Sequence, residues 1–400
     1  MTHRQLALAV YVPTFFLSFA QGVVLPTMPL YAAEFATSVG LIGVAVAALA
    51  FGTMLADLPA GLLIQRTGRR PMMLAGAGMV AASFVGLAVA RVYPELVLFR
   101  LVGGVGTACW GLSRLAFMAD AVPPASRGRA LSTFGGLQRL GTFTGPVTGG
   151  WVGELFGLRA SFTVAAALAL AATLLSVLFV PETRPATTHT ARGRWRVLGT
   201  VLRRNAGDVL GASAAQVFAQ MIRSGRQLIV PLYGNRVLGM DAGAIGTIVS
   251  ISAVIDMSLF LPAGMLMDRL GRKYASIPSF LVMALGMALV PLADGFAGLL
   301  LATAVIGLGN GLGSGTMMTL GADLAPREAA GEFLGLWRLV GDAGQMAGPL
   351  AVGALAGALG FTVTALTLSG VGLLAAGTIF LAVQETLHGA STGPQPAGER

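Results

Sequence analysis

Long apolar stretches separated by short polar turns recur along the whole sequence. A helix of about 20 apolar residues crosses a hydrocarbon core of roughly 30 Å, and membrane helices tolerate the glycines and prolines that several stretches contain. The stretches lie at roughly 6–31, 39–64, 71–91, 94–118, 130–152, 160–181, 207–233, 243–267, 274–294, 296–320, 331–357 and 361–384. The pattern predicts an all-α integral membrane protein with twelve transmembrane helices.

The first stretch starts behind a charge, in "MTHRQLALAV", as a secretory signal would. It continues without charge from Gln5 to Tyr31, which is longer than the apolar region of a signal peptide. An equivalent stretch also occurs inside the chain, at 207–233. We therefore expect the first stretch to stay in the mature protein as a transmembrane helix.

One long polar stretch, residues 182–206, divides the apolar stretches six and six. We interpret it as a cytoplasmic linker. It separates a six-helix bundle at 1–181 from a second six-helix bundle at 207–400, which ends in a short cytoplasmic tail.

The two predicted bundles are copies of one unit. The decapeptide "GLLIQRTGRR" (61–70) has a near copy, "GMLMDRLGRK" (264–273), 203 residues later. At the same offset Asp120 matches Asp323, and Gly145-Pro146 matches Gly348-Pro349. Since each copy has an even number of spans, the copies have the same orientation. They are predicted to be parallel repeats about an axis along the membrane normal, with a site between them near the midplane.

Composition and charge support the membrane assignment and set the topology. The chain is 55% hydrophobic and 11% charged, with a mean hydropathy of +0.78, so it cannot cover a soluble surface. A net charge of +9 suggests nucleic acid only in a soluble protein, and no nucleic-acid partner is expected. Of the 26 basic residues, 17 lie at one set of span ends. By the positive-inside rule both termini are cytoplasmic, in a membrane of the bacterial inner (plasma) type.

Metal, cofactor and nucleotide chemistry are not expected. Cys109 is the single cysteine, and His3, His189 and His388 all lie outside the predicted spans. "GAGMVA" (76–81) resembles a dinucleotide fingerprint, but it follows no strand and sits inside a span, so helix packing explains it. Without a P-loop, transport driven by ATP within this chain is excluded, and the chain is not predicted to be an enzyme.

These features together resemble the major facilitator superfamily over essentially the whole chain, and within it the 12-helix drug and proton antiporters. The motif GxxxDRxGRK/R is intact in the second copy, while the first has Gln65 where the family has Asp. Arg100 with Gly104 and Gly106 is similar to the family's fourth-helix motif. "GTFTGPVTGG" is similar to the fifth-helix motif of antiporters, and its residues are Gly141, Gly145, Pro146, Gly149 and Gly150.

The resemblance implies a breakable charge cluster at each decapeptide loop, joined by an acid that ends the fourth helix of the same half. A purely structural alternative is that the loop glycines allow a tight turn and that the basic residues anchor the loop on the cytoplasmic side. Because Gln65 removes one charge, we expect the second cluster to be the stronger lock. The implied gating residues are Gly61, Arg66, Gly68, Arg69 and Asp120 in the first half, and Gly264, Asp268, Arg269, Gly271, Arg272 and Asp323 in the second.

The fifth-helix motif has two interpretations that the sequence leaves open. Its glycines have the small-xxx-small spacing that lets helices approach closely. Pro146 removes a helical hydrogen bond and favours a kink, so the segment is either tightly packed or a hinge.

Charges inside the predicted spans are expensive and need a partner or a task. Asp256 has no partner on its own helix and is the first candidate for carrying a proton, because burial disfavours its charged form. Asp57 is next, with Arg114 or Arg139 as its expected neutralising partner and structural and coupling roles both open. Asp342 follows Arg338 by four residues and is expected to pair with it locally.

Polar residues align on four helices that line the central cavity in the resembled family. Residues 216, 220, 223 and 227 form one helical face, which packed helices could also use for mutual hydrogen bonding. Arg223 and Arg226 would bind an anionic substrate group or hold Asp256 in one state. The candidate substrate cavity comprises Gln21, Arg100, Thr107, Gln216, Gln220, Arg223, Arg226, Gln227, Asn310 and Arg338.

The resulting functional prediction is a secondary active transporter. We expect proton-coupled efflux of small organic molecules or drugs by alternating access, working as a monomer in the lipid bilayer. The alternative is a proton-coupled uptake symporter for a small organic acid or sugar. Six arginines against three aspartates within the spans argue against a pump for cationic drugs alone. An open channel is less consistent with paired gating motifs.

Overall fold

A computed structural model describes residues 3–36, 38–122, 124–181, 206–326 and 329–386, which are helical and contain no strand. The predicted linker lies outside these residues except for Ala206. The first half comprises α1 (His3–Leu6), a π-helical turn (Ala7–Tyr11), α2 (Val12–Phe35), α3 (Val39–Thr67), α4 (Arg69–Val89), α5 (Tyr93–Ala121), α6 (Pro124–Phe156) and α7 (Leu158–Phe179).

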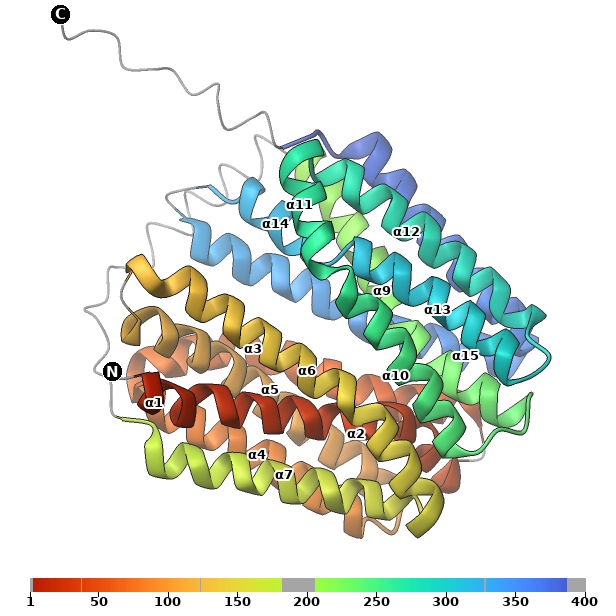
Figure 1. Cartoon of the computed structure of the whole chain (residues 1–400), viewed down its shortest axis with the longest axis horizontal. Coiled ribbons are helices and arrows are strands. Elements are labelled where there is room, and N and C mark those ends of the chain that lie inside the picture. Colours follow the sequence, from red (N-terminus) through yellow and green to blue (C-terminus); the bar gives the residue numbers. More distant parts are fainter. Residues whose placement is uncertain (1–2, 37, 123, 182–205, 327–328, 387–400) are drawn as a thin grey trace, which may run out of the picture.

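The second half comprises the remaining helices (Figure 1). They are α9 (Ala206–Arg236), α10 (Ala242–Ser258), α11 (Phe260–Leu270), α12 (Arg272–Leu289), a 3-10 turn (Val290–Leu292), α13 (Phe296–Leu312), α14 (Thr316–Leu324) and α15 (Ala330–Ala382). Figure 1 shows the helices of each half lying together, with the two groups side by side.

The count of candidate spans in the described residues is compatible with the predicted twelve once three long helices are taken into account. Nine segments of the described chain are long and apolar enough to cross a membrane. The 33-residue α6 and the 31-residue α9 are not among them, because both carry arginines and many small polar residues. The 53-residue α15 counts once although it turns at Gly360, whose φ of 82° favours glycine. The arrangement is consistent with twelve spans.

Two predicted spans are each broken into two helices, and the two breaks lie next to each other. The span expected at 243–267 is interrupted at Leu259, between α10 and α11. The span expected at 296–320 is interrupted between α13 and α14, where Gly315 has a φ of 82°. The breaks are adjacent in space, because a Cβ on Gly311 would lie 2.9 Å from that of Leu259. Non-helical backbone of this kind occurs at membrane depth only where protein or a cavity surrounds it.

The repeat predicted from sequence is visible in equivalent tertiary contacts. The Tyr31 hydroxyl donates to the Leu87 carbonyl at 2.9 Å, which joins the first and third spans of the first half. In the second half the Tyr233 hydroxyl donates to the Pro291 carbonyl at 3.3 Å. Each tyrosine therefore links the first and third spans of its half at the same end of the bundle.

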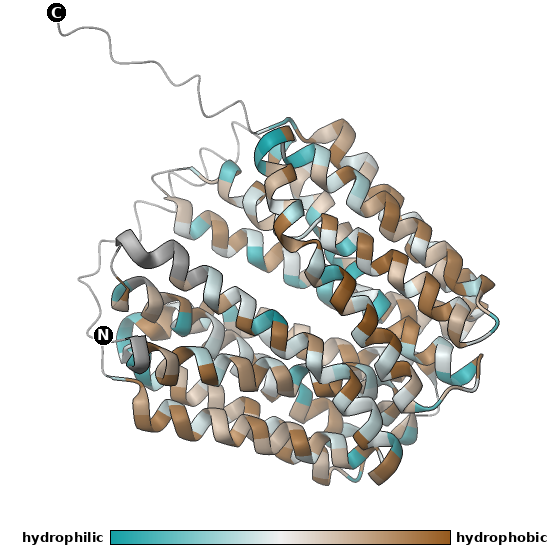
Figure 2. Ribbon diagram, viewed as in Figure 1, coloured by the Kyte–Doolittle hydropathy of each residue, from teal (hydrophilic) through white to brown (hydrophobic). Residues whose placement is uncertain are grey.

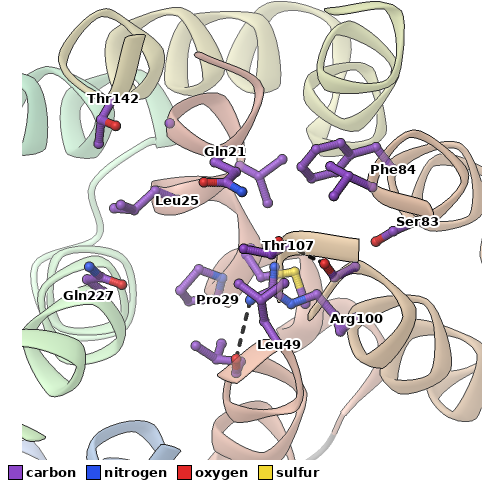
Figure 3. A pocket seen from close by; sticks show the side chains of 16 residues that line it. Gln21, Leu25, Pro29, Leu49, Ser83, Phe84, Arg100, Thr107, Thr142 and Gln227 are labelled. Atoms are coloured by element: carbon purple, nitrogen blue, oxygen red, sulfur yellow. Dashed lines mark hydrogen bonds between the residues drawn. The ribbon is translucent and has the colours of Figure 1, made fainter. Parts of the chain in front are cut away.

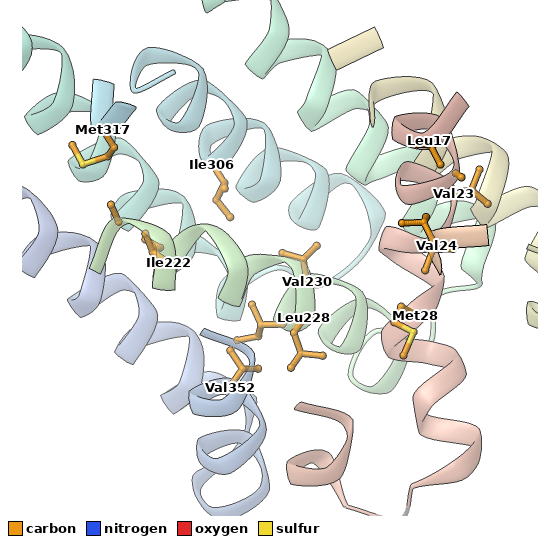
Figure 4. Packing of buried hydrophobic residues seen from close by; sticks show 14 of the residues in the cluster. Leu17, Val23, Val24, Met28, Ile222, Leu228, Val230, Ile306, Met317 and Val352 are labelled. Atoms are coloured by element: carbon orange, nitrogen blue, oxygen red, sulfur yellow. The ribbon is translucent and has the colours of Figure 1, made fainter. Parts of the chain in front are cut away.

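Apolar side chains fill the interior and also cover the outside of the bundle. Figure 2 shows hydrophobic residues along most of each helix, with hydrophilic residues gathered at helix ends and at a few interior positions. A buried cluster runs through both halves, and Figure 4 shows part of it, with Val24 and Met28 from α2 near Leu228 and Val230 from α9. The core thus continues across the seam between the halves.

The seam is closed at the end of the bundle formed by the turns near Ala36, Gly157 and Met240, called here the opposite end. The amide of Gly243 in α10 donates to Glu154 Oε2 in α6 at 2.9 Å. A Cβ on Gly150 would lie 2.9 Å from the Cα of Gly246, and one on Gly43 would lie 3.0 Å from that of Gly353. Such close backbone approach requires glycine.

The same helices are separated at the other end, called here the basic end, which carries the decapeptide turns Thr67–Arg69 and Leu270–Arg272. Among the described residues, no atom lies within 4 Å of a Cβ built on Gly61 of α3, Gly135 of α6, Gly264 of α11 or Gly335 of α15. Figure 1 also shows the helices of the two halves diverging toward this end, so we interpret the structure as the conformation that opens toward the basic end.

Candidate substrate and proton sites

A pocket of about 240 Å³ lies between the halves and draws most of its lining from the first half (Figure 3). Gln21 from α2 and Arg100 and Thr107 from α5 supply polar groups, and Gln227 reaches in from α9. Among the described residues, Arg100 is the only charged one that lines it, and its Nη2 donates to the Val46 carbonyl at 3.3 Å. The remaining lining is mainly apolar, including Val24, Leu25, Met28, Leu49 and Phe84.

Two further pockets continue this space in opposite directions. A pocket of about 130 Å³ shares Leu25, Thr142 and Gln227 with the first and is lined by Arg226 and Asp256. A pocket of about 190 Å³ shares Gln21 and Thr107 with the first. This third pocket is the more polar and is lined by Ser18, Trp110, Arg114, Gln138 and Arg338, among others. The first pocket therefore adjoins each of the other two through shared lining residues.

Four predicted cavity residues do not line these pockets, namely Gln216, Gln220, Arg223 and Asn310, and the last of them hydrogen-bonds Asp256. The side chains of Gln216 and Gln220 lie against Gly341 and Gly344 of α15, where they pack helices within the second half. Arg223 lies over the Phe280 ring, and its Nη2 donates to the Gly313 carbonyl at 3.1 Å. The polar face predicted on α9 is therefore divided, because only its far end, with Arg226 and Gln227, reaches the cavity.

Asp256 lies in the second pocket between residues from three helices. Asn310 of α13 donates through Nδ2 to Asp256 Oδ2 at 2.5 Å, and Arg226 Nη2 of α9 is 4.0 Å from the same oxygen. The other carboxylate oxygen is buried and has no hydrogen-bond partner in the described part of the chain. Asp256 thus has one carboxylate oxygen available to a proton and faces the basic side chain of Arg226.

Asp57 is paired with Arg338, which corrects the expectation that Arg114 or Arg139 would neutralise it. Arg338 Nε lies 2.7 Å from Asp57 Oδ2 and 4.0 Å from Asp342 Oδ2. The predicted local pair of Arg338 and Asp342 is therefore the looser of the two contacts. α15 packs along α3, so that the arginine reaches an acid of the other half before the acid on its own helix.

Arg139 of α6 makes a second polar bridge across the seam. Its Nη2 donates to Ser314 Oγ at 2.5 Å, at the break between α13 and α14, and its guanidinium lies 4.1 Å from the Phe260 ring centroid. Arg223 holds the adjacent carbonyl of Gly313. Two arginines from different halves therefore bind the break between α13 and α14, Arg139 through the Ser314 side chain and Arg223 through the Gly313 backbone.

The charge pairs expected at the decapeptide turns are present, with one change. Arg69 pairs with Asp120, and Arg272 Nε lies 2.8 Å from Asp323 Oδ2. Asp268, by contrast, is exposed and forms no ion pair within the described residues, which corrects its predicted place in the cluster.

The segment after α15 takes part in the second cluster instead of Asp268. The amides of Arg272 and Lys273 donate to Glu385, and the Thr386 hydroxyl donates to Asp323 Oδ2 at 2.6 Å. A carboxylate at the amino terminus of α12 is favourable, because the first amides of a helix are unsatisfied and carry partial positive charge.

The turn geometry explains the glycines of the gating motif. Gly68 and Gly271 have φ values of 92° and 114°, which side chains other than glycine rarely adopt. Arg66 and Arg269 beside them are exposed, and within the described residues no other helix lies within 4 Å of a Cβ built on Gly61 or Gly264.

The glycines of the fifth-helix motif pack against two different neighbours. Gly141, Gly145 and Gly149 lie directly against the backbone of α2, so that a Cβ on any of them would collide with it. Pro146 and Gly150 lie on the opposite half's α10, at Gly246. The motif is therefore a close-packed strip that also forms the closed seam, which favours the packing interpretation in this conformation.

Sequence reasoning missed several cavity residues. Thr142, Ser83 and Gln138 line the pockets. The first follows Gly141 inside the fifth-helix motif, and this position was the available signal. Ser83 and Gln138 carry no pattern that distinguishes them from polar residues that pack between helices.

Comparisons with known proteins agree with this architecture. The family model described as Major Facilitator Superfamily matches residues 10–331 and 212–398. The multidrug resistance protein MdtH of Aeromonas hydrophila is 26% identical over 346 residues, which are 83% of each chain. The multi-drug resistance efflux pump PmrA of Streptococcus pneumoniae is 30% identical over 165 residues, which are 40% of this chain and 41% of that one.

Among solved structures, the crystal structure of a D-xylose-proton symporter superposes with a TM-score of 0.78. The match covers 96% of this chain and 99% of that chain at 18% identity. Because the two sequences are only 18% identical, this similarity is evidence for a shared fold and not for a shared substrate.

Proposed function

The chain belongs to the Major Facilitator Superfamily, and from that premise we propose that it is a proton-coupled exporter of small organic molecules or drugs that works by alternating access. The relatives named as multidrug resistance and efflux proteins support export. The cavity is built from the helices of a single chain, which supports transport by a monomer.

The observation that carries the proposal is the position of Asp256. Its carboxylate lines a pocket to which both halves contribute, and it contacts Asn310 and faces Arg226. When the carboxylate is charged, it attracts Arg226 and holds it in the pocket wall. When a proton neutralises it, that attraction is lost and Arg226 is released toward the cavity. Proton binding at Asp256 would thus change the charge that a substrate meets.

The conformation fits one step of an export cycle. With the basic end facing the cytoplasm, as the positive-inside rule requires, the open seam admits substrate from the cell interior. Export would then need the seam at Gly150 and Gly246 to open and the basic end to close. Inward proton flow supplies about 2.3 kcal/mol per charge for each 100 mV of membrane potential, in addition to the pH gradient.

Uptake of a small organic acid is a second candidate, favoured by the excess of arginine over aspartate in the cavity. A growth requirement for the protein on a single organic acid would support uptake, whereas lower accumulation of dyes or drugs in cells that express it would support export.

Accumulation in an efflux-deficient bacterium tests the proposal. Cells expressing wild type, Asp256→Asn or Asp241→Asn receive ethidium, a fluoroquinolone or the anionic dye fluorescein, with and without a protonophore. Asp241 is an exposed carboxylate at the opposite end, outside the cavity, and it serves as the matched control. We expect wild type and Asp241→Asn to lower accumulation of at least one compound, and both Asp256→Asn and the protonophore to abolish the effect.

Unchanged accumulation of every compound in cells with wild-type protein would contradict export. If Asp256→Asn still exports and the protonophore still blocks it, the proton site would lie elsewhere, with Asp57 as the next carboxylate to test.

A further inference from the structure

Arginine residues on α5 form a stripe that faces the cavity. Arg100, Thr107 and Arg114, called here the α5 stripe, are separated by seven residues each. Seven residues bring a helix back to nearly the same direction, with a drift of about 20°. All three line the connected pockets. With a rise of about 1.5 Å per residue, the two arginines are about 21 Å apart along the helix.

Arg100 is buried, and the described part of the chain places no acid in an ion pair with it. Its residue is 8% exposed, and its Nε has no hydrogen-bond partner within the described residues. The Val46 carbonyl accepts one bond from Nη2 at 3.3 Å, which leaves the guanidinium with most of its donors unused. Figure 3 shows its side chain at the wall of the first pocket beside Thr107.

Arg114 is in a similar position at the other end of the stripe. It is 9% exposed and lies over the Phe134 ring, with 4.2 Å between the guanidinium carbon and the ring centroid. Its Nε and the Trp110 Nε1 beside it are both buried donors for which the described chain offers no acceptor. Two neighbouring donors without acceptors in a polar pocket indicate a ligand that supplies acceptor atoms.

The acidic residues near the cavity pair with arginines outside the α5 stripe. Asp57 and Asp342 share Arg338, and Asp256 faces Arg226. The charged residue that shares the third pocket with Arg114 is Arg338, which is also positive. After these pairs are set aside, the α5 stripe retains two uncompensated positive charges, and an ionised guanidinium in a low-dielectric site requires a counter-charge.

We propose that Arg100 and Arg114 are two successive binding positions for the acidic group of an amphipathic organic anion, and that such anions are the substrate class of the proposed exporter. The inference rests on the proposed function for the direction of transport. A carboxylate or sulfonate satisfies the unused donors, and the apolar lining that includes Leu25, Met28 and Phe84 holds the rest of the molecule.

Arg114 and Arg100 lie at different depths along the bundle, as two successive positions on a transport path would. Arg114 is seven residues from the basic-end terminus of α5, and Arg100 is seven residues from its opposite-end terminus. Thr107 lies halfway between them. An anion that enters from the open basic end meets Arg114 first, and Arg100 lies nearer the end through which it would leave.

Binding of a matched pair of probes tests the site. Dansylglycine is a monocarboxylate, and its methyl ester has the same body without the charge. Purified full-length protein in nanodiscs is titrated with each, and energy transfer to the dansyl group from the four tryptophans, which include Trp110 in the third pocket, reports binding. The variants are Arg100→Gln, Arg114→Gln and Arg114→Lys, with the exposed Arg91→Gln as control. Because the ester partitions more into lipid, the informative quantity is the change that each substitution causes for each probe.

We expect Arg114→Gln to weaken dansylglycine binding by about tenfold or more, since hydrogen bonds to charged groups are strong, and to change ester binding less than about twofold. Arg114→Lys retains the charge and should restore part of the affinity, and Arg91→Gln should match wild type. Thermal stability gives a separate readout. Removing an unpaired buried charge should leave Arg114→Gln as stable as wild type or more so, whereas an arginine with a structural role would lower stability.

Equal losses for both probes, no loss for dansylglycine, or binding of neither probe would overturn the anion site. The same nanodisc protein moved into proteoliposomes separates this result from the proposed function. If neither probe nor ethidium moves when a pH gradient is imposed, proton-coupled transport fails while the binding data still decide the site. Transport of ethidium without transport of dansylglycine would keep the transporter and reject the anion class.

Discussion

Arg338 of α15 and Asp57 of α3 form an ion pair of 2.7 Å that joins the two halves of the bundle. The Asp57 side chain is 7% exposed and that of Arg338 is 33% exposed, so the pair is partly shielded from water. It lies between the closed opposite end and the open basic end, where it links the halves in this conformation.

A double-mutant cycle on this pair should show coupling. Arg338→Gln leaves the Asp57 carboxylate buried without its counter-charge, and we expect it to destabilise the protein by about 1 to 3 kcal/mol, since removal of one partner of a buried pair is costly. Asp57→Asn should cost less, because Arg338 keeps Asp342 as a second partner. Thermal unfolding in detergent measures each change.

The double variant should lose less stability than the sum of the single variants, with a coupling of about 1 kcal/mol. Strict additivity would mean that the two side chains contribute nothing to each other, and the pair could not hold the halves together.

The close seam between Gly150 and Gly246 predicts a specific loss of transport. Gly150→Val would place a side chain against the Gly246 backbone and prevent closure of the opposite end, so we expect transport to fall to background while expression is unchanged. Gly78→Val on α4 is the matched control, because no protein atom of the described chain lies within 4 Å of its Cβ. Equal activity of the two variants in vesicles would contradict the seam as a moving contact.

The contacts at the second decapeptide turn predict unequal roles for its two aspartates. Asp323→Asn loses charge at an oxygen that binds both Arg272 and Thr386, and we expect transport to fall several-fold. Asp268→Asn is on the exposed surface and should change stability by less than about 0.5 kcal/mol. Transport rates at matched expression compare them. A larger defect in Asp268→Asn would show that Asp268 forms its contacts in another conformation of the cycle.

The proposed anion class predicts a dependence on membrane potential. Exchange of one proton for one anion moves positive charge inward twice, whereas exchange of one proton for ethidium moves no net charge. An inside-negative potassium diffusion potential should therefore accelerate dansylglycine efflux from proteoliposomes, by up to about 2.3 kcal/mol of driving force per charge at 100 mV. No response of dansylglycine efflux would contradict anion export coupled to proton entry.

The sequence predicted the features that repeat or that cost energy in a membrane. The apolar runs gave the spans, and the two decapeptides gave the turns at Gly68 and Gly271 because left-handed backbone there requires glycine. The acids Asp120 and Asp323 were identified as partners of Arg69 and Arg272 through the resemblance, and the structure contains both pairs.

Contacts between different spans could not be predicted from the sequence. Helical spacing relates Arg338 to Asp342, but nothing in the spacing indicates that α15 packs on α3 and brings Asp57 closer. The division of the α9 face could not be predicted for the same reason. Gln216 and Gln220 are covered by glycines of α15, a helix that lies far along the chain. The helix break at Gly315 is hidden within an apolar run, because two glycines there are equally compatible with an unbroken membrane helix.

Substrate-driven proton movement in proteoliposomes tests the central claim most directly. Vesicles that contain a pH-sensitive dye and wild type, Asp256→Asn or Asp241→Asn are preloaded to a proton gradient and then given ethidium or dansylglycine. We predict that at least one substrate makes wild type and Asp241→Asn dissipate the gradient, and that Asp256→Asn does not respond. A substrate that moves with no change in the proton gradient, or an Asp256→Asn variant with wild-type proton flux, would contradict proton-coupled export through Asp256.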